Sequence, residues 1–145
     1  MSREETILTA IGTTLAAVTG LSASAVVEGI PTPGDLRPGM AYYTIDTITS
    51  TRDGASLTEY KHEAEFNIIV AVPADGSTPG ARVRAALAMA SLIRRALETN
   101  YELGGNGLDV SMDWTSLDGD QFGVPGAGIA LGLLTVWWLS DQGGD

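Results

Sequence analysis

Three aspartates lie close together in the sequence and form its densest group of possible metal ligands: Asp113, Asp118 and Asp120. Hard cations such as Ca²⁺ bind several carboxylates on a flexible loop, so a small acidic metal- or ligand-binding domain is one hypothesis. The spacing lacks the glycine and the final glutamate of an EF-hand loop. Because acidic residues at a hairpin tip also keep a protein soluble, we predict a solvated turn here and no metal site.

Gly126, Gly128 and Gly132 resemble the glycines of a nucleotide-binding loop. A dinucleotide fingerprint, however, needs a strand before its glycines and a helix after them. Here the glycines open an uncharged run that extends to Leu139 and contains β-branched and aromatic residues, which favours a strand. We interpret the glycines as sites of close backbone packing and predict no cofactor.

The single histidine, His62, lies between Lys61 and Glu63. Histidine can act as a general base, but no serine or cysteine constellation accompanies it in the sequence. We predict that His62 occupies a hydrogen-bonded or solvated position at the start of a strand, with no catalytic role. The protein is therefore not expected to be an enzyme, and a hydrolase with an unrecognised site is the alternative.

The composition narrows the possible functions further. With 145 residues and no cysteine, the chain fits one domain, residues 1–145, without disulfides or thiolate chemistry. The formal net charge of −10 argues against a surface that neutralises phosphates. Glu4 and Glu5 stand where a signal peptide would carry basic residues. We expect a soluble protein that is not secreted by that route and does not bind a membrane.

Apolar residues at helical spacing predict two helices, over residues 2–19 and 79–99. Ser2 and Glu5 have the spacing of a capping box at the start of the first helix. The predicted buried stripe of the first helix consists of Ile7, Ile11, Leu15 and Val18. The predicted buried stripe of the second consists of Val83, Ala86, Leu87, Ala90, Ile93 and Leu97.

Alternating or β-branched segments predict four strands, over residues 40–51, 59–72, 108–117 and 126–139. The intervening loop, residues 20–39, is rich in proline and glycine and contains a short extended piece at residues 25–28. The predicted fold is α/β (α+β): one four-stranded, mainly antiparallel sheet with two helices on one face, in the order α-β-β-α-β-β.

The last predicted strand is apolar on both faces. Its odd positions include Ile129, Leu133 and Trp137, and its even positions include Leu134 and Trp138. Two helices can cover only one face of a four-stranded sheet, so we hypothesise that another protein chain covers the second face.

Charged and aromatic residues supply the candidates for contacts with partners. Half of the basic residues lie on the second helix: Arg82, Arg84, Arg94 and Arg95. Because the protein is so acidic, we expect these arginines to form salt bridges, within the chain or to an acidic neighbour, more readily than contacts to nucleic acid. Of the adjacent tryptophans, which point to opposite faces, at least one is an interface candidate. The predicted interface set is Arg82, Arg84, Asp118, Asp120, Trp137 and Trp138.

The order of these elements resembles the tail terminator (tail completion) proteins of long-tailed bacteriophages and related gene transfer agents. The resemblance covers nearly the whole chain and is one of layout, not of an invariant motif. Its corresponding stretches are EETILTAIGTTLAAV, DLRPGMAYYTIDT, YKHEAEFNIIVAV, GARVRAALAMASLIRRAL, LDVSMDWTS and GIALGLLTVWW.

The resemblance implies a virion protein of the tail neck, assembled in the host cytoplasm, with no catalytic residues. Copies would form a ring, typically a hexamer, that caps the head-proximal end of the tail tube and stops its polymerisation. The implied partners are the tail tube protein, the head-side connector or stopper protein, and genomic DNA passing through the lumen without sequence-specific binding. Loops 20–39, 52–58 and 117–125 are the expected contacts to tube and connector. Another head–tail joining or tail-tube-like component is the alternative within this class.

Overall fold

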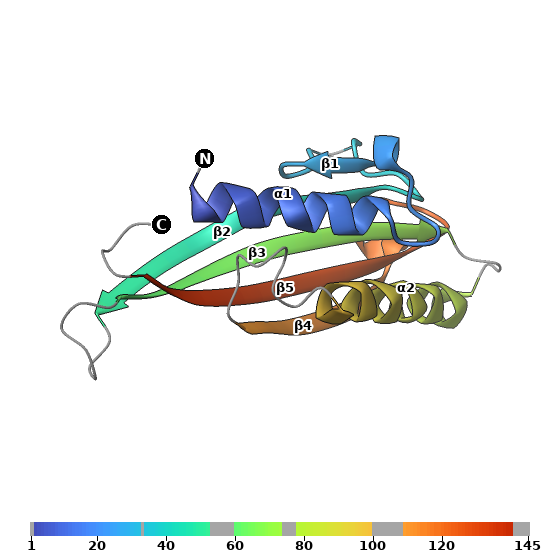
Figure 1. Ribbon diagram of the computed structural model, residues 1–145. Helices are drawn as coiled ribbons and strands as arrows, with labels where there is room; N and C mark the ends of the chain where they lie inside the picture. Colours follow the sequence, from blue (N-terminus) through green and yellow to red (C-terminus); the bar gives the residue numbers. More distant parts are fainter. Residues whose placement is uncertain (1, 33, 53–59, 74–77, 100–108, 141–145) are drawn as a thin grey trace.

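The computed structural model describes residues 2–32, 34–52, 60–73, 78–99 and 109–140, which form two helices and one mixed sheet (Figure 1). The helices are α1 (Arg3–Ala16) and α2 (Pro79–Thr99). The strands are β1 (Val26–Glu28), β2 (Ala41–Arg52), β3 (Tyr60–Pro73), β4 (Asp109–Asp118) and β5 (Ala127–Ser140). Two 3₁₀ turns, η1 (Ala23–Ala25) and η2 (Gly119–Phe122), precede β1 and β5 respectively.

The sheet has five strands in the order β1-β2-β3-β5-β4, so the predicted number of four is wrong. The additional strand, β1, lies within the extended piece foreseen at residues 25–28 and pairs parallel to the start of β2. Three residues are too few for alternation to signal a strand, and only pairing with Ala41–Tyr43 makes β1 one. The four long strands pair antiparallel as predicted.

Both helices pack on the same face of the sheet, where they form the main hydrophobic core (Figure 1). The capping box at the start of α1 is confirmed, because Ser2 N donates to Glu5 Oε2 at 2.8 Å and Glu5 N donates to Ser2 Oγ at 3.2 Å. All four residues of the predicted α1 stripe are buried. The strands contribute alternate residues to this core, among them Ala64, Phe66, Ile68, Val70, Leu134 and Val136.

The buried stripe of α2 differs from the prediction at four positions, because Val83 is half-buried and Leu87 exposed, whereas Arg82 and Met89 are buried. Leu87, predicted to be buried, is 58% exposed, whereas Arg82 is only 6% exposed. The buried residues of the helix are Arg82, Ala86, Met89, Ala90, Ile93 and Leu97. Leu87 lies about 100° around the helix from Ala86, which places it beside the stripe. Leu87 was predicted to be buried because it is hydrophobic and lies close to the stripe. Arg82 is buried because the ion pairs described below hold its side chain against the sheet.

Two of the three glycines occupy places where a side chain would collide, which confirms close packing as their role. A Cβ atom on Gly128 would meet the backbone carbonyl of Arg82, so α2 lies directly against β5 at this point. A Cβ atom on Gly132 would come within 2.8 Å of the Trp114 ring. Gly126 has a different role, because its φ of 76° lies in the left-handed region at the turn before β5.

The close approach at Gly128 makes a testable prediction. The substitution Gly128→Ala should reduce the free energy of unfolding by about 1–3 kcal/mol, because the methyl group would force α2 away from β5. Gly80→Ala is the matched control, since Gly80 lies in the first turn of α2 with open space around it. It should be neutral or stabilising by up to about 1 kcal/mol. Urea unfolding curves measure both, and equal effects would contradict the packing argument.

The second face of the sheet is covered at one end by the chain itself. Ile129 and Ala71 lie there in a second buried cluster with Val124 and Ala127. Leu36, from the loop before β2, and Leu117, from the end of β4, pack against this cluster. The hypothesis that another chain covers this face is therefore wrong for the start of β5. Further along β5, Leu133 and Trp137 are half-buried and Leu139 is exposed.

Candidate interaction surfaces

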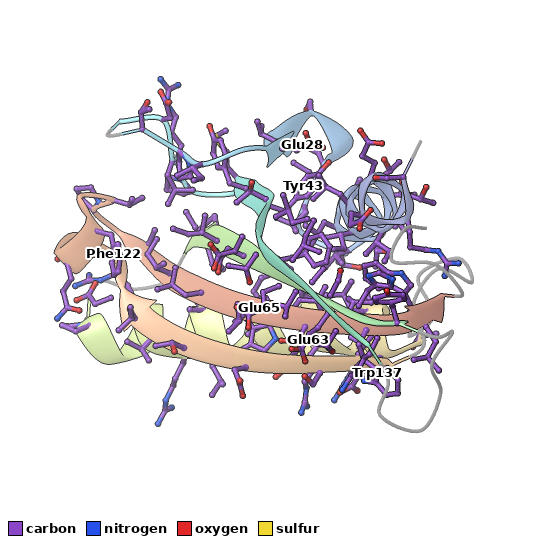
Figure 2. The ribbon with its side chains drawn as sticks, turned by 90° about the vertical axis from the view of Figure 1, so that its left-hand side faces the viewer. Glu28, Tyr43, Glu63, Glu65, Phe122 and Trp137 are labelled. Atoms are coloured by element: carbon purple, nitrogen blue, oxygen red, sulfur yellow. The ribbon has the colours of Figure 1, made fainter. Side chains whose placement is uncertain are left out.

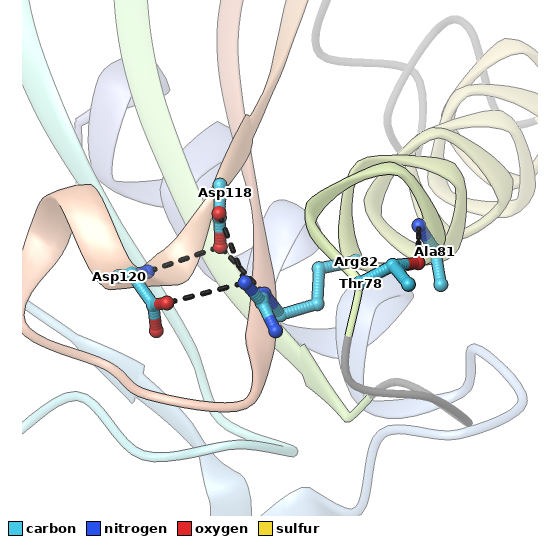
Figure 3. A network of polar contacts seen from close by, with 5 residues as sticks. All are labelled: Thr78, Ala81, Arg82, Asp118 and Asp120. Carbon is cyan, nitrogen blue, oxygen red and sulfur yellow. Dashed lines mark hydrogen bonds and ion pairs between the residues drawn. The ribbon is translucent and has the colours of Figure 1, made fainter.

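An ion-pair network connects the start of α2 to the end of β4 (Figure 3). Arg82 Nε donates to Asp118 Oδ1 at 2.7 Å, and Arg82 Nη2 donates to Asp118 Oδ2 at 3.1 Å. Arg82 Nη2 also donates to Asp120 Oδ2 at 3.1 Å. Asp118 in turn accepts a hydrogen bond from Asp120 N at 3.2 Å and so caps η2. A paired arrangement of this kind orders both carboxylates around one guanidinium.

These contacts change the assignment of two predicted interface residues, Arg82 and Asp118. Arg82 and the carboxylate of Asp118 are almost covered and face one another, so within this chain they join elements instead of meeting a partner. Asp120 keeps an exposed side chain, and Arg84, two residues after Arg82 in α2, is exposed as well. Asp113 lies on the opposite face of β4 from Asp118, because their positions differ by an odd number. The three aspartates therefore do not converge on a common point.

The network has an electrostatic consequence. The hydrogen bonds from Arg82 are the largest cause that lowers the pKa of Asp118 below its ordinary value. The same hydrogen bonds raise the pKa of Arg82 further. A carboxylate with a lowered pKa in the folded state stabilises the fold above its unfolded pKa, near 4, and this contribution disappears as pH falls through the folded value. Acidification should therefore loosen the contact between α2 and β4.

We predict that Asp118→Asn lowers the urea midpoint at pH 7, because a neutral amide cannot balance the covered Arg82 charge. The difference from the wild type should shrink as pH falls below about 4, because Asp118 of the unfolded wild-type chain then takes up a proton, and the folded carboxylate does so only at lower pH. Asp120→Asn should have a smaller effect at pH 7, since the Asp120 side chain is 52% exposed. A difference that does not change between pH 7 and pH 3 would argue against the ion pair as its source.

His62 and Trp138 lie together in the core. His62 is 1% exposed, its ring stacks on Trp138 with centroids 5.4 Å apart, and its Nδ1 lies 2.7 Å from Ser50 Oγ. His62 thus has the predicted hydrogen bond but not a solvated edge, and sequence reasoning missed Ser50 as its partner. Ser50 and His62 are brought together by the pairing register of β2 and β3, which places them opposite one another. Only that register could have predicted the contact. Trp138 is equally covered, so it presents no surface to a partner.

Ser50 and His62 do not make a credible catalytic pair. A general base must come within hydrogen-bond reach of a substrate proton, and His62 is only 1% exposed. Four cavities along the described residues are lined by side chains other than these two. Among the described residues, no group of three or more acidic or histidine side chains is placed to hold a metal ion. The geometry therefore favours a structural role for this pair.

The open part of the second face is wide, acidic and rich in threonine. One row across the four long strands consists of Thr47, Glu65, Thr135 and Ser111. The next row towards η2 consists of Thr44, Asn67, Leu133 and Asp113. Figure 2 labels Glu63 and Glu65 on β3 and Trp137 on β5 along this part of the sheet, with Phe122 at the η2 end. No ion pair between described residues involves Glu63, Glu65 or Asp113.

The two ends of the sheet differ in character. At one end, Phe122 of η2 and the loop around Leu36 line a groove of about 270 Å³, and Ile30 of the same loop region is strongly exposed. At the other end, Lys61 Nζ lies 4.9 Å above the Trp137 ring, a cation–π contact beside the exposed Leu139. Predicted contact loops 20–39 and 117–125 meet at the first end, whereas loop 52–58 lies almost wholly outside the described residues.

The chain matches no protein-family model and no curated protein sequence. In the described part of the chain, neither helix has the length and apolar character needed to cross a membrane.

Proposed function

We propose that the protein is a structural component of a bacteriophage tail neck, where copies form a ring that caps the tail tube and joins it to the head-side connector. The observation that supports this most is the open second face of the sheet. One face of the sheet is sealed by both helices, and the opposite face carries Glu63, Glu65 and Asp113 amid threonines. A face of this kind suits contact with water and not with a buried core.

In the proposed ring the helices lie on the outside and the acidic face lines the lumen. DNA carries a dense negative charge, so a lumen with carboxylates repels the phosphates and allows the duplex to pass without binding. The same reasoning excludes a function in which this face holds DNA. The two unlike ends of the sheet, around Phe122 and around Trp137, would then contact the two different neighbours of the ring, the tube and the connector.

The test of this proposal is electron microscopy of purified particles, with the protein located by antibody labelling or density. We expect a single ring where the tail tube meets the head. Copies distributed along the tube, or a ring on the head side of the neck, would assign the protein to another tail or head–tail joining component. Absence from the particle would reject the proposal.

Charge reversal on the open face provides a second test. In the double variant Glu63→Lys and Glu65→Lys, purified rings should bind duplex DNA, and the affinity should fall steeply as salt is raised. Wild-type rings should bind weakly or not at all at low salt. Glu98→Lys is the control, because Glu98 is exposed on α2 and would lie outside the lumen. Fluorescence anisotropy measures the binding, and equal gains in the double variant and the control would argue against a lumen on this face.

A further inference from the structure

Among the described strands, no further strand lies beside either long side of the sheet, apart from the short β1. β1 pairs only with Ala41–Tyr43, so the rest of β2, from Thr44 to Arg52, has no further strand beside it in the described structure. On the opposite side β4 is the last strand of the sheet among the described residues. Unpaired backbone groups along an edge are a template for pairing with another chain.

Each open edge is flanked by an apolar groove between the edge strand and the helix above it. Beside β2, Leu8 of α1 and Ile45 and Ile48 of β2 line a groove of about 470 Å³. Ile48 is 49% exposed, which is unusual for an isoleucine in a long strand. The other residues of this groove are Ser2, Glu4 and Glu5, so its rim is acidic.

The groove beside β4 has a similar construction but a different charge. Leu87 of α2 and Met112 and Trp114 of β4 line a space of about 290 Å³, together with Ala90 and Ser91. Leu87, the residue that departed from the predicted core, is the exposed apolar residue at its mouth. Its charged residues are Arg94 and Asp113, so the helix side of this groove is basic. Trp114 Nε1 is buried there without a hydrogen-bond partner among the described residues.

We propose that these grooves form one contact between copies of this chain, in which the β4–α2 edge of one copy docks against the β2–α1 edge of the next. Leu87 would meet the apolar groove around Ile48, and Arg94 would face the acidic rim at Glu4. This pairing joins opposite charges, whereas two β2 edges would bring acidic rims together. The closure of such contacts into a ring rests on the proposed function.

Strand directions are compatible with this contact. Because β2, β3, β5 and β4 alternate in direction, β4 runs opposite to β2 within one copy. Two copies placed side by side in the same orientation therefore bring β4 and β2 together antiparallel, the more stable pairing. Both helices stay on one side and the acidic face stays on the other. The contact joins different patches and so is heterologous, which closes into a ring when the rotation between copies allows it.

The main experiment uses two variants that each damage one edge, Leu87→Asp and Ile48→Asp. Both side chains are exposed, so the fold should persist, and circular dichroism checks this. Analytical ultracentrifugation of the wild-type chain should show concentration-dependent association. Each variant alone should associate about tenfold more weakly or worse. Leu92→Asp, 41% exposed on α2 but outside both grooves, should associate like the wild type.

Mixing the two variants makes the test specific for a head-to-tail contact. Leu87→Asp keeps an intact β2 edge and Ile48→Asp keeps an intact β4 edge, so the mixture should form dimers and stop there. A variant that still dimerises alone would show a symmetric contact instead and overturn the proposal. The charge pair has its own test: Glu4→Arg and Arg94→Glu should each weaken association, and the two changes combined in one chain should restore it.

Failure of this contact can be distinguished from failure of the proposed function. If both edge variants associate as strongly as the wild type, the proposed contact is overturned. The location of the protein in the particle would still decide its function. A wild-type chain that stays monomeric at all concentrations would likewise overturn self-association through these edges. A ring found at the neck in that case would have to form through other surfaces.

Discussion

β5 is apolar on both of its faces and pairs along its whole length with β3 and, over most of it, with β4, so each face needs its own cover. On one face α2 supplies it, and Gly128 permits the helix backbone to touch the strand. On the other face Val124, just after η2, and Leu36, in the loop before β2, cover the first half of the strand only. The uneven cover divides the second face into a small hydrophobic cluster and a broad polar surface.

The Arg82 network holds this arrangement together at the η2 end. Arg82 lies one helical turn before Ala86, at the place where α2 touches β5, and its guanidinium reaches the carboxylates at the end of β4. A charged group this well covered is tolerated because Asp118 pairs with it through two hydrogen bonds. The network thus positions the helix, the edge strand and the turn that covers Ile129 relative to one another.

The surfaces left open are consistent with a protein that functions by assembly. The acidic face, the two apolar grooves and the two unlike ends point in different directions, and the proposed ring, with its lumen and two axial neighbours, uses each of them for a different contact. Leu87 and Ile48 are exposed at opposite sides of one sheet and not in one patch. Such a distribution favours contacts between different surfaces, because a symmetric dimer would need a single self-complementary patch.

The sequence by itself determined both helices and the four long strands, because their periodicity is carried by local residues such as Ile7, Ile11 and Leu15 or Ala64, Phe66 and Ile68. It also indicated that Gly128 and Gly132 serve close packing. Only the tertiary structure decided that β1 is a strand, that Arg82 is buried on α2 while Leu87 is exposed, and that Trp138 lies against His62. Each of these depends on a partner distant in the sequence, so pairing and packing, not local pattern, determine them.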